Sequence, residues 1–318
     1  MERRLVVKLE PRKFINSKIK EIRKEAGNKG ALVATSGGVD SMVCAVLAHK
    51  ALGRKAVILF IDDGLMRISD EKRVRGELKP FGIKVNIVRV ADDFFKALKG
   101  KVDPEEKRKA FRNLFYRTLG KAVRKSRVEC LIQGTIAADI IETKGKIKTQ
   151  HNILEQIGID PKKHFGFTVV EPLREIFKYQ VRKVAKELGF SPVVHQQMPF
   201  PGPGLATRVV GEVTPQKVKI LRKAVEIVEE EMKRLKPFQA FAVLLNDKAT
   251  GIRKGKRLFG NIIAIRSVES NDAMTASITK IPWPILEKIR ERIIKEIPEV
   301  VKVVYDITPK PPSTIEYI

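Results

Sequence analysis

The residues best suited to chemistry form one short run: Ser36, Gly37, Gly38, Val39, Asp40 and Ser41. This run, called the phosphate loop below, follows an apolar segment and precedes a helical one. Two consecutive glycines let the backbone turn tightly and approach an anion closely. The N–H groups at the start of the next helix attract phosphate, and the helix dipole adds to that attraction. We therefore predict that the loop cradles phosphate groups, with serine hydroxyls as further donors.

Asp40 is the unexpected member of the phosphate loop, because a carboxylate repels phosphate. Its presence favours a role as a ligand for Mg²⁺ that bridges phosphate oxygens. The alternative is a tight turn whose Asp and Ser merely cap the following helix. Capping needs only one such residue, so the complete run favours phosphate binding. No Gly-Lys-Ser/Thr follows the glycines, so the loop is not a Walker A motif.

The elements around the loop alternate between buried strands and amphipathic helices. Apolar runs predict strands at residues 31–35, 56–61, 83–90 and 130–133. Helical patterns occupy residues 11–26, 39–51 and 104–124. Strands separated by helices imply βαβ units, so we expect an α/β fold in which helices cover both faces of a parallel sheet.

The alternation of apolar and helical segments stops at residues 198–204. This stretch holds three prolines in seven residues and predicts a rigid loop. We place a domain boundary just before it, giving domains at 1–195 and 196–318. The second domain has predicted helices at 214–235 and 284–296. Its predicted strands are 238–245, 258–268, 300–307 and 314–317. This order suggests a small α+β domain.

Composition limits the classes of function. The net charge of +26 attracts polyanions, yet the basic residues alternate with acids, as in the run EKRVRGELK, which resembles a solvated helix face. Aromatic residues make up only 6%, so nucleic-acid binding is not favoured. No stretch of 18 apolar residues predicts a membrane span, and no signal peptide is visible. Cys44 and Cys130 are isolated, which indicates a reduced, cytoplasmic protein.

The phosphate loop resembles the PP-loop of the N-type ATP-pyrophosphatases, which cleave ATP between the α- and β-phosphates and pass AMP to a substrate. The run Ile61–Arg67 is similar to the segment of that family beside which the adenosine end of ATP lies. The resemblance implies that the six loop residues, together with Asp63 and Leu65, bind ATP. It also implies Mg²⁺ at Asp40.

Further segments resemble the GMP synthetases within that superfamily. The run Asp103–Lys109 is similar to their DPExKRK motif and implies that Arg108 contacts XMP. A region near 136–165 resembles their mobile lid, and it implies catalytic roles for Asp139, Glu142 and Lys148. Gln150 departs from the family, which has histidine there.

The second half extends the resemblance to GMP synthetases. The run Val170–Lys178 matches a family motif and implies a catalytic Lys178. The run PFPGPGL and the C-terminal run KVVYDITPKPPSTIE resemble XMP-binding segments. By position they imply this set of XMP contacts: Gly202, Pro203, Gly204, Gln239, Lys302, Lys310, Ile315 and Glu316. Lys302 stands where the family has arginine, which loses a bidentate grip on phosphate.

The resemblance implies a ligase that adenylylates XMP and aminates it to GMP. Neither cysteine lies in a setting typical of a reactive thiolate. We therefore expect a separate glutamine amidotransferase subunit to supply the ammonia. A homodimer through the C-terminal domain is also implied. Residues 262–265 and the strand near Val300 are consistent with either a sheet shared between two copies of the chain or a monomer core.

Two other functions remain open from the residues. A PP-loop enzyme that adenylylates a tRNA base would use the positive charge, although this chain has no Cys-x-x-Cys pair. A non-catalytic ATP-binding module is the second, and the acidic residues of the lid argue against it.

Overall fold

The computed structural model describes residues 9–144, 160–195, 197–270 and 273–318. The chain divides into two compact units. Unit 1 comprises residues 1–62, 69–89 and 115–197, and unit 2 comprises residues 63–68, 90–114 and 198–318. Neither unit is one continuous stretch of chain, because the segments 63–68 and 90–114 pack with the C-terminal residues.

Unit 1 is built on a five-stranded parallel sheet with the order β3-β2-β1-β4-β5. The strands are β1 (Ala31–Ala34), β2 (Ala56–Asp62), β3 (Val85–Arg89), β4 (Cys130–Ile132) and β5 (Thr168–Val170). The central strands are buried on both faces, and Leu32, Val33 and Leu131 are fully inaccessible. Such strands read as continuous apolar runs, which is why the sequence predicts β1, β2 and β4 correctly, while β3 is predicted from its alternating apolar residues. It misses β5, which is only three residues long.

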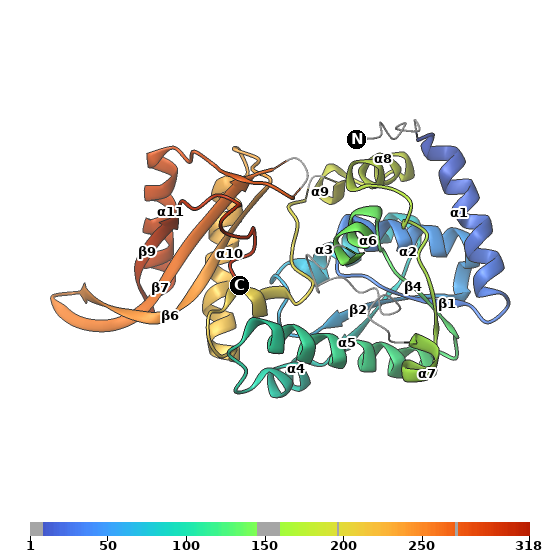
Figure 1. The fold of residues 1–318 in the computed structure, drawn as a ribbon, viewed down its shortest axis with the longest axis horizontal. Coiled ribbons are helices and arrows are strands. Elements are labelled where there is room, and N and C mark those ends of the chain that lie inside the picture. Colours follow the sequence, from blue (N-terminus) through green and yellow to red (C-terminus); the bar gives the residue numbers. More distant parts are fainter. Residues whose placement is uncertain (1–8, 145–159, 196, 271–272) are drawn as a thin grey trace. The chain divides into compact units, whose positions relative to one another are not determined.

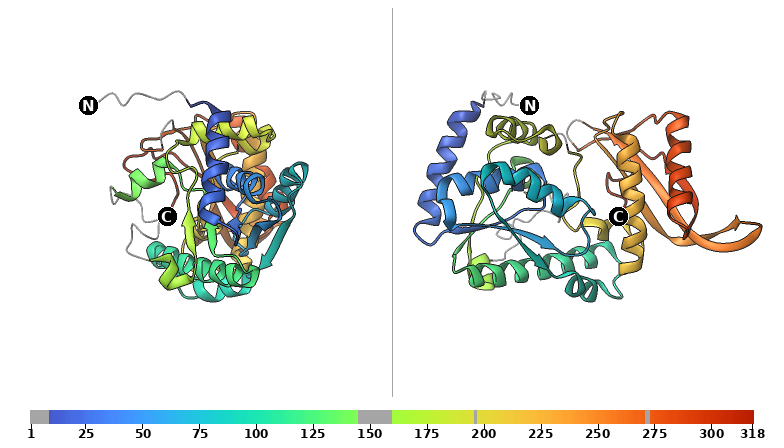
Figure 2. Two further views of the ribbon diagram at one scale, coloured as in Figure 1. Left: turned by 90° about the vertical axis from the view of Figure 1, so that its right-hand side faces the viewer. Right: turned by 180° about the vertical axis from the view of Figure 1, so that it is seen from behind.

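Helices cover both faces of this sheet, as predicted (Figure 1). On one face α1 (Pro11–Ala26), α2 (Val39–Leu52) and α8 (Lys178–Leu188) pack together. On the other lie α7 (Pro161–Phe165) and the C-terminal half of α5 (Pro104–Ser126), where Tyr116 stacks on Phe165. The rear view shows the same layers (Figure 2). The shorter helices are α3 (Asp70–Leu78), α6 (Ala137–Lys144) and α9 (Pro192–His195).

Unit 2 contains a second sheet with helices against it. The long strands β6 (Gln239–Arg253) and β7 (Lys256–Glu269) form an antiparallel hairpin. β7 also pairs with β8 (Ser277–Ile278) and, in parallel, with β9 (Val300–Asp306). α10 (Pro215–Met232) packs on β6 and on α11 (Trp283–Glu296), while α4 (Ala91–Leu98) precedes α5. Residues 262–265 and β9 therefore pair within one chain, which fits the monomer-core alternative.

The predicted strand at 314–317 is wrong, because the C-terminal tail (residues 307–318) forms turns rather than a ladder. Pro311 and Pro312 supply no N–H group to a ladder. The backbone carbonyls accept hydrogen bonds from the buried Arg266 instead. Its Nε donates to the oxygen of Ile315 at 2.9 Å and its Nη2 to that of Thr314 at 2.6 Å. The tail pairs with other backbone at Lys310, which bridges to Ala276, whereas at residues 314 and 315 an arginine side chain takes the place of strand pairing.

Within unit 2, the N-terminal end of α5 is tied to the segment that precedes α10. Lys107 is fully buried, and its Nζ donates a hydrogen bond to the carbonyl of Val209 at 2.8 Å. Burial, together with the charges of Lys217 and Arg108, lowers the pKa of Lys107 to about 8. The protein therefore carries a lysine whose charged form is disfavoured by folding.

The depressed pKa of Lys107 predicts a pH dependence of stability. Below pH 8 both states hold the proton and the cost of burying the charge is fully present. Between pH 8 and 10.5 the unfolded chain retains the proton and the folded chain does not, so stability rises with pH. Lys107→Met should lower this slope by up to about 1.4 kcal/mol per pH unit, measured by urea unfolding at several pH values. The exposed Lys109→Met is the control, and equal slopes in wild type and Lys107→Met would contradict the assignment.

Candidate functional site

The phosphate loop connects the end of β1 to the start of α2 and is braced by its own polar groups. The backbone N–H of Ser36 donates to Oγ of Ser41 at 3.2 Å, and that hydroxyl donates to the carbonyl of Gly38 at 3.0 Å. Gly37 has φ +83°, a conformation that favours glycine. The N-cap Gly38 offers no capping side chain to α2, so the interpretation of the loop as a capped turn is not supported. The first N–H groups of α2 are suited to an anion.

Arg73, which the sequence analysis missed, holds the phosphate loop from outside. Its Nη1 donates to the carbonyl of Gly37 at 2.8 Å, and its Nη2 contacts Oδ1 of the buried Asp70 at 2.7 Å. Arg73 lies in the run EKRVRGELK, whose alternating charges resemble a solvated helix face. Its side chain is instead only 14% exposed. No local pattern in the sequence reveals this contact.

Asp40 and Lys178 come together although 138 positions separate them. Lys178 is the first residue of α8, and its Nζ donates to Oδ2 of Asp40 at 2.5 Å. Oδ1 of Asp40 is buried and has no hydrogen-bond partner among the described residues. A buried unsatisfied carboxylate oxygen is costly, and it is the kind of ligand that a hard cation takes. Mg²⁺ usually needs only one or two carboxylates besides substrate phosphates, so Asp40 fits this ion.

Neither cysteine is suited to nucleophilic chemistry. Cys44 and Cys130 are both buried and free. Burial raises the pKa of the Cys44 thiol well above its usual range and that of Cys130 to about 11. Both remain thiols at neutral pH, which agrees with the structural role predicted for them. Among the described residues no three His, Cys, Asp or Glu side chains cluster as a ready-made metal site.

The structure describes only part of the predicted lid. Oδ2 of Asp139 accepts a hydrogen bond from the backbone N–H of Ile136 at 2.9 Å, which supports the start of α6. Glu142 lies in α6, but its side chain is not described. Lys148 and Gln150 lie outside the described residues. The catalytic roles of these residues therefore stay predictions.

Of the run Ile61–Arg67, predicted to lie beside the adenosine end of ATP, residues 63–67 are anchored within unit 2. Oδ1 of Asp63 accepts from the N–H of Leu65 at 2.8 Å, and the carbonyl of Leu65 accepts from the N–H of Leu205 at 2.9 Å. Arg222 of α10 donates to the carbonyls of Gly64 and Met66. These contacts fix the backbone of the segment, and no local pattern in the sequence pointed to Arg222.

The glycines of the PFPGPGL run have different surroundings. Gly204 has φ +60°, and a Cβ there would lie 2.6 Å from the carbonyl oxygen of Leu65. The space that a side chain at Gly204 would need is therefore taken by the backbone of Leu65. No atom lies within 4 Å of a Cβ added at Gly202. Pro203 precedes the short 3-10 helix Gly204–Arg208 as its N-cap residue.

Two of the predicted XMP contacts meet in unit 2. Nε2 of Gln239 donates to Oε1 of Glu316 at 2.6 Å. Ile315 packs with Val268 and Ala276, and Nζ of Lys310 donates to the carbonyl of Ala273 at 2.7 Å.

The other two predicted side chains lie elsewhere in unit 2. Lys302 is exposed on β9, and Arg108 forms an ion pair with Glu105 on its own helix. The described contacts of the Glu316 carboxylate include neither of them.

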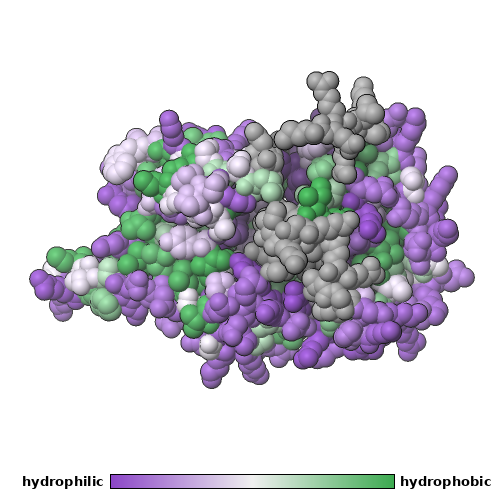
Figure 3. All heavy atoms as spheres, in the orientation of Figure 1, coloured by the Kyte–Doolittle hydropathy of each residue, from purple (hydrophilic) through white to green (hydrophobic). Residues whose placement is uncertain are grey.

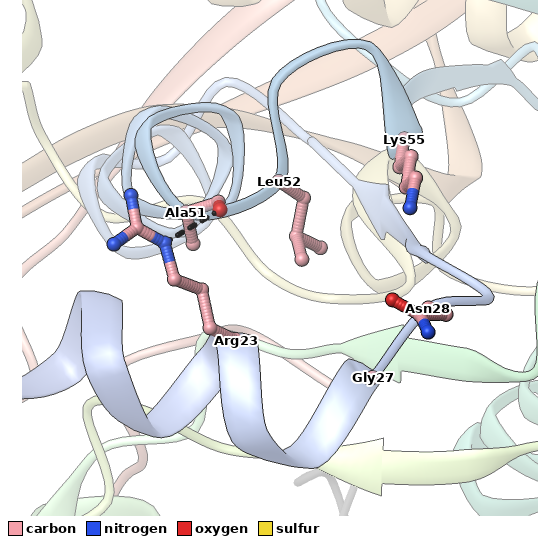
Figure 4. A pocket seen from close by; sticks show the side chains of 6 residues that line it. All are labelled: Arg23, Gly27, Asn28, Ala51, Leu52 and Lys55. Carbon is pink, nitrogen blue, oxygen red and sulfur yellow. Dashed lines mark hydrogen bonds between the residues drawn. The ribbon is translucent and has the colours of Figure 1, made fainter.

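A hollow of about 370 Å³ lies within unit 1, at the C-terminal end of α2 (Figure 4). Arg23, Gly27, Asn28, Ala51, Leu52 and Lys55 line it. Nε of Arg23 donates to the carbonyl of Ala51 at 2.9 Å, so this arginine satisfies the C-terminal end of α2. A 14-residue helix is about 20 Å long, so the hollow is remote from the phosphate loop.

Gly134 offers a test of the loop geometry. A Cβ at this position would lie 3.0 Å from the Cβ and carbonyl carbon of Asp40 and from the nitrogen of Ser41. Gly134→Ala should displace the loop slightly, weaken ATP binding about tenfold and lower the free energy of unfolding by about 1 kcal/mol. Calorimetric titration and urea unfolding measure the two effects.

Gly76→Ala is the matched control, because no atom lies within 4 Å of a Cβ at this helical position. It should raise the free energy of unfolding by about 0.5–1 kcal/mol and leave ATP binding unchanged. Unaltered ATP affinity in Gly134→Ala would show that contact with Gly134 does not shape the loop.

Two known protein families match separate stretches of this chain. Residues 11–193 match the family described as PP-loop domain, and residues 226–317 match GMP synthase C terminal domain. One subunit of the glutamine-hydrolyzing GMP synthase of Methanopyrus kandleri is 47% identical over 97% of this chain and 99% of its own length. The protein of the same name from Archaeoglobus fulgidus is 50% identical over 96% and 98%.

The protein of that name from Pyrococcus furiosus is 48% identical over 96% of this chain and 97% of its own length. In the described part of the chain, no helix combines the length and apolar character needed to cross a membrane. In each comparison the match covers nearly the whole of both chains. This chain therefore belongs to the same family as that subunit of the glutamine-hydrolyzing GMP synthases.

Proposed function

We propose that the chain is a ligase of purine biosynthesis that forms a C–N bond, converting XMP to GMP at the expense of ATP. The observation that carries the proposal is the phosphate loop, in which an uncapped helix start adjoins the Asp40–Lys178 pair. Backbone N–H groups suit the phosphates of ATP, and the pair places a cation beside them. The names of the relatives refer to GMP synthase and not to tRNA modification, so the alternative of a tRNA-modifying enzyme is not favoured.

In the proposed reaction, the C2 oxygen of XMP attacks the α-phosphorus of ATP. The bond from that phosphorus to the β-phosphate bridge breaks, and pyrophosphate leaves. Ammonia then attacks C2, the C2–O bond breaks, and AMP leaves with the oxygen while the nitrogen loses a proton. The loop amides and Lys178 would offset charge that develops on the phosphates during the first step. AMP and pyrophosphate are therefore the expected products alongside GMP.

Asp40 would hold Mg²⁺ through its unpartnered Oδ1, while Oδ2 stays with Lys178. The ion would supply charge neutralisation on the phosphate oxygens. The predicted lid, with Asp139, Glu142 and Lys148, would exclude water from the activated intermediate. The two buried thiols suit a cytoplasmic, reduced protein.

XMP is proposed to bind to unit 2 through Gln239, Ile315, Glu316 and Lys310, with Gly202, Pro203, Gly204, Arg108 and Lys302 as further contacts. The proximity of Gln239 to Glu316 supports this assignment. The division into domains at 1–195 and 196–318 remains part of the proposal.

The nitrogen donor is proposed to come from a separate glutamine amidotransferase subunit. Neither cysteine is available as the nucleophile that glutamine hydrolysis requires, because both thiols are buried. Free ammonium salt should therefore support the reaction, whereas glutamine should support it only after the amidotransferase subunit is added.

The test combines XMP, ATP, Mg²⁺ and either ammonium or glutamine, with chromatography of the nucleotides. With ammonium we expect GMP, AMP and pyrophosphate in equal amounts, and with glutamine alone we expect none. Asp40→Asn should lower turnover by about a hundredfold or more, since it removes the carboxylate that is proposed to hold Mg²⁺ beside the phosphates. Asp247→Asn, at an exposed position of β6, is the matched control and should leave turnover unchanged. Release of ADP, or ammonium-fed mixtures without GMP, would reject the proposed reaction.

Unit 2 is also proposed to mediate a homodimer. β9 pairs only with β7 among the described strands, so its other edge is a template for pairing. Large apolar side chains are exposed on this unit: Ile252, Phe259, Val304 and Ile307. Figure 3 shows hydrophobic residues gathered over β6, β7 and β9. A second copy of the chain would cover them.

Light scattering during size-exclusion chromatography tests the dimer. The measured mass of the wild type should be twice the chain mass of 35.9 kDa. Phe259→Asp or Val304→Asp should reduce the measured mass to that of one chain, because each places a charge on the apolar surface. Val193→Asp changes an equally apolar residue, 57% exposed in α9 of unit 1, and should stay dimeric. A monomeric wild type at micromolar concentration would refute the assembly.

A further inference from the structure

Two arginines are the largest fully buried side chains in the described part of the chain, Arg208 and Arg266. Sequence analysis singled out neither. Arg266 binds mostly backbone carbonyls of the tail, along with the carboxylate of Asp306, and so fixes the path of the chain. Arg208 differs, because its hydrogen bonds go to a single side chain, that of Glu316.

The pair between Arg208 and Glu316 is bidentate. Nε donates to Oε2 at 3.0 Å, and Nη2 donates to Oε1 at 2.9 Å. The guanidinium lies over the ring of Phe241 at 4.0 Å and that of Phe200 at 4.8 Å. Such a fork fixes the plane of a carboxylate as well as its position, which a lysine cannot do.

The hydrogen bonds to the Glu316 carboxylate do not use all of its lone pairs. Two oxygens offer about four lone-pair directions. Oε1 accepts from Arg208 and from Gln239, and Oε2 accepts from Arg208. One direction on Oε2 is therefore left unused by these partners. The Glu316 side chain is 15% exposed while that of Arg208 is 1% exposed, so of the two side chains only that of Glu316 is open to solvent to any extent.

Arg208 also retains a spare donor. Its Nη1 is buried and has no hydrogen-bond partner among the described residues. Burying a charge pair is weak evidence of a stabilising role, because well-packed apolar residues often do as well or better. An unsatisfied donor adds a further cost. The arrangement is better explained by a need for a carboxylate of fixed direction.

We propose that Arg208 is a positioning residue that aims Glu316, so that the remaining lone pair on Oε2 accepts a ring N–H of the purine base. This inference rests on the proposed function, in which Glu316 contacts XMP. Arg208 itself acts through Glu316 and gives the site its selectivity for a base that carries a ring N–H. A base without that donor leaves the carboxylate unpaired.

The test compares two ligands by calorimetric titration, XMP and purine riboside 5′-monophosphate, whose base has no N–H at its six-membered ring. Wild type should bind XMP at least about tenfold more tightly. Arg208→Lys keeps the charge and loses the fork, so XMP affinity should fall about tenfold and the preference should approach one. Affinity for purine riboside monophosphate should change less than twofold. A purely structural role would weaken both ligands equally.

Arg292→Lys is the matched control. Arg292 of α11 forms ion pairs with Glu230, Glu231 and Glu296, so its replacement disturbs an arginine–carboxylate cluster of the same unit that does not include Glu316. It should leave the preference between the two ligands intact. Glu316→Gln is the second variant, for use should Arg208→Lys not fold, and it should also abolish the preference.

Each result decides the matter. A folded Arg208→Lys that keeps the wild-type preference overturns the positioning role while the amination assay can still succeed. Should Arg208→Lys not fold, a Glu316→Gln that keeps the preference overturns it equally. Wild type that binds XMP without preference overturns the inference alone. Wild type that binds no XMP and forms no GMP overturns both this inference and the proposed function.

Discussion

The start of α2 imposes the constraint on which the ATP-related part of the structure depends. A helix leaves its first N–H groups unsatisfied, and Gly38 provides no capping side chain. These donors favour an anion, and Asp40 at the same turn would repel it unless a cation lies between them. Lys178 neutralises one oxygen of Asp40 and leaves the other without a partner among the described residues. With the divalent ion proposed above, the loop and the lysine would form one electrostatic arrangement, which would explain why the six residues occur together.

Local patterns predicted most of the regular structure. The apolar runs of β1, β2 and β4 and the helical face of α1 each satisfy their pattern within a few residues, because both faces or one stripe must be buried. The tail was predicted wrongly from its apolar residues, which suggest a strand. Its path is instead determined by Pro311, Pro312 and Arg266. Units made of separate stretches, such as 63–68 with 198–318, depend on packing between distant segments that no local pattern records.

The phosphate loop was visible in the sequence because its residues are adjacent. The arginines that support both candidate sites were not, because each contacts residues distant in the chain. Arg73 lies 36 positions from Gly37, and Arg208 lies 108 positions from Glu316. In sequence each is one of 63 basic residues in a chain whose charges alternate. Only burial distinguishes these arginines from the solvated majority, and burial of a charged side chain is a property of the tertiary fold.

The two nucleotides call for recognition of different kinds. Backbone amides around a glycine turn grip phosphate by charge and shape, and they carry no information about the base. This explains why a PP-loop alone leaves several activities open. Discriminating among purines requires a directional acceptor with few free lone pairs, because a site built for a donor penalises a base that lacks it. The bidentate hold of Arg208 on Glu316 would give unit 2 such an acceptor, so the proposal assigns base selectivity to the C-terminal residues and phosphate binding to the loop.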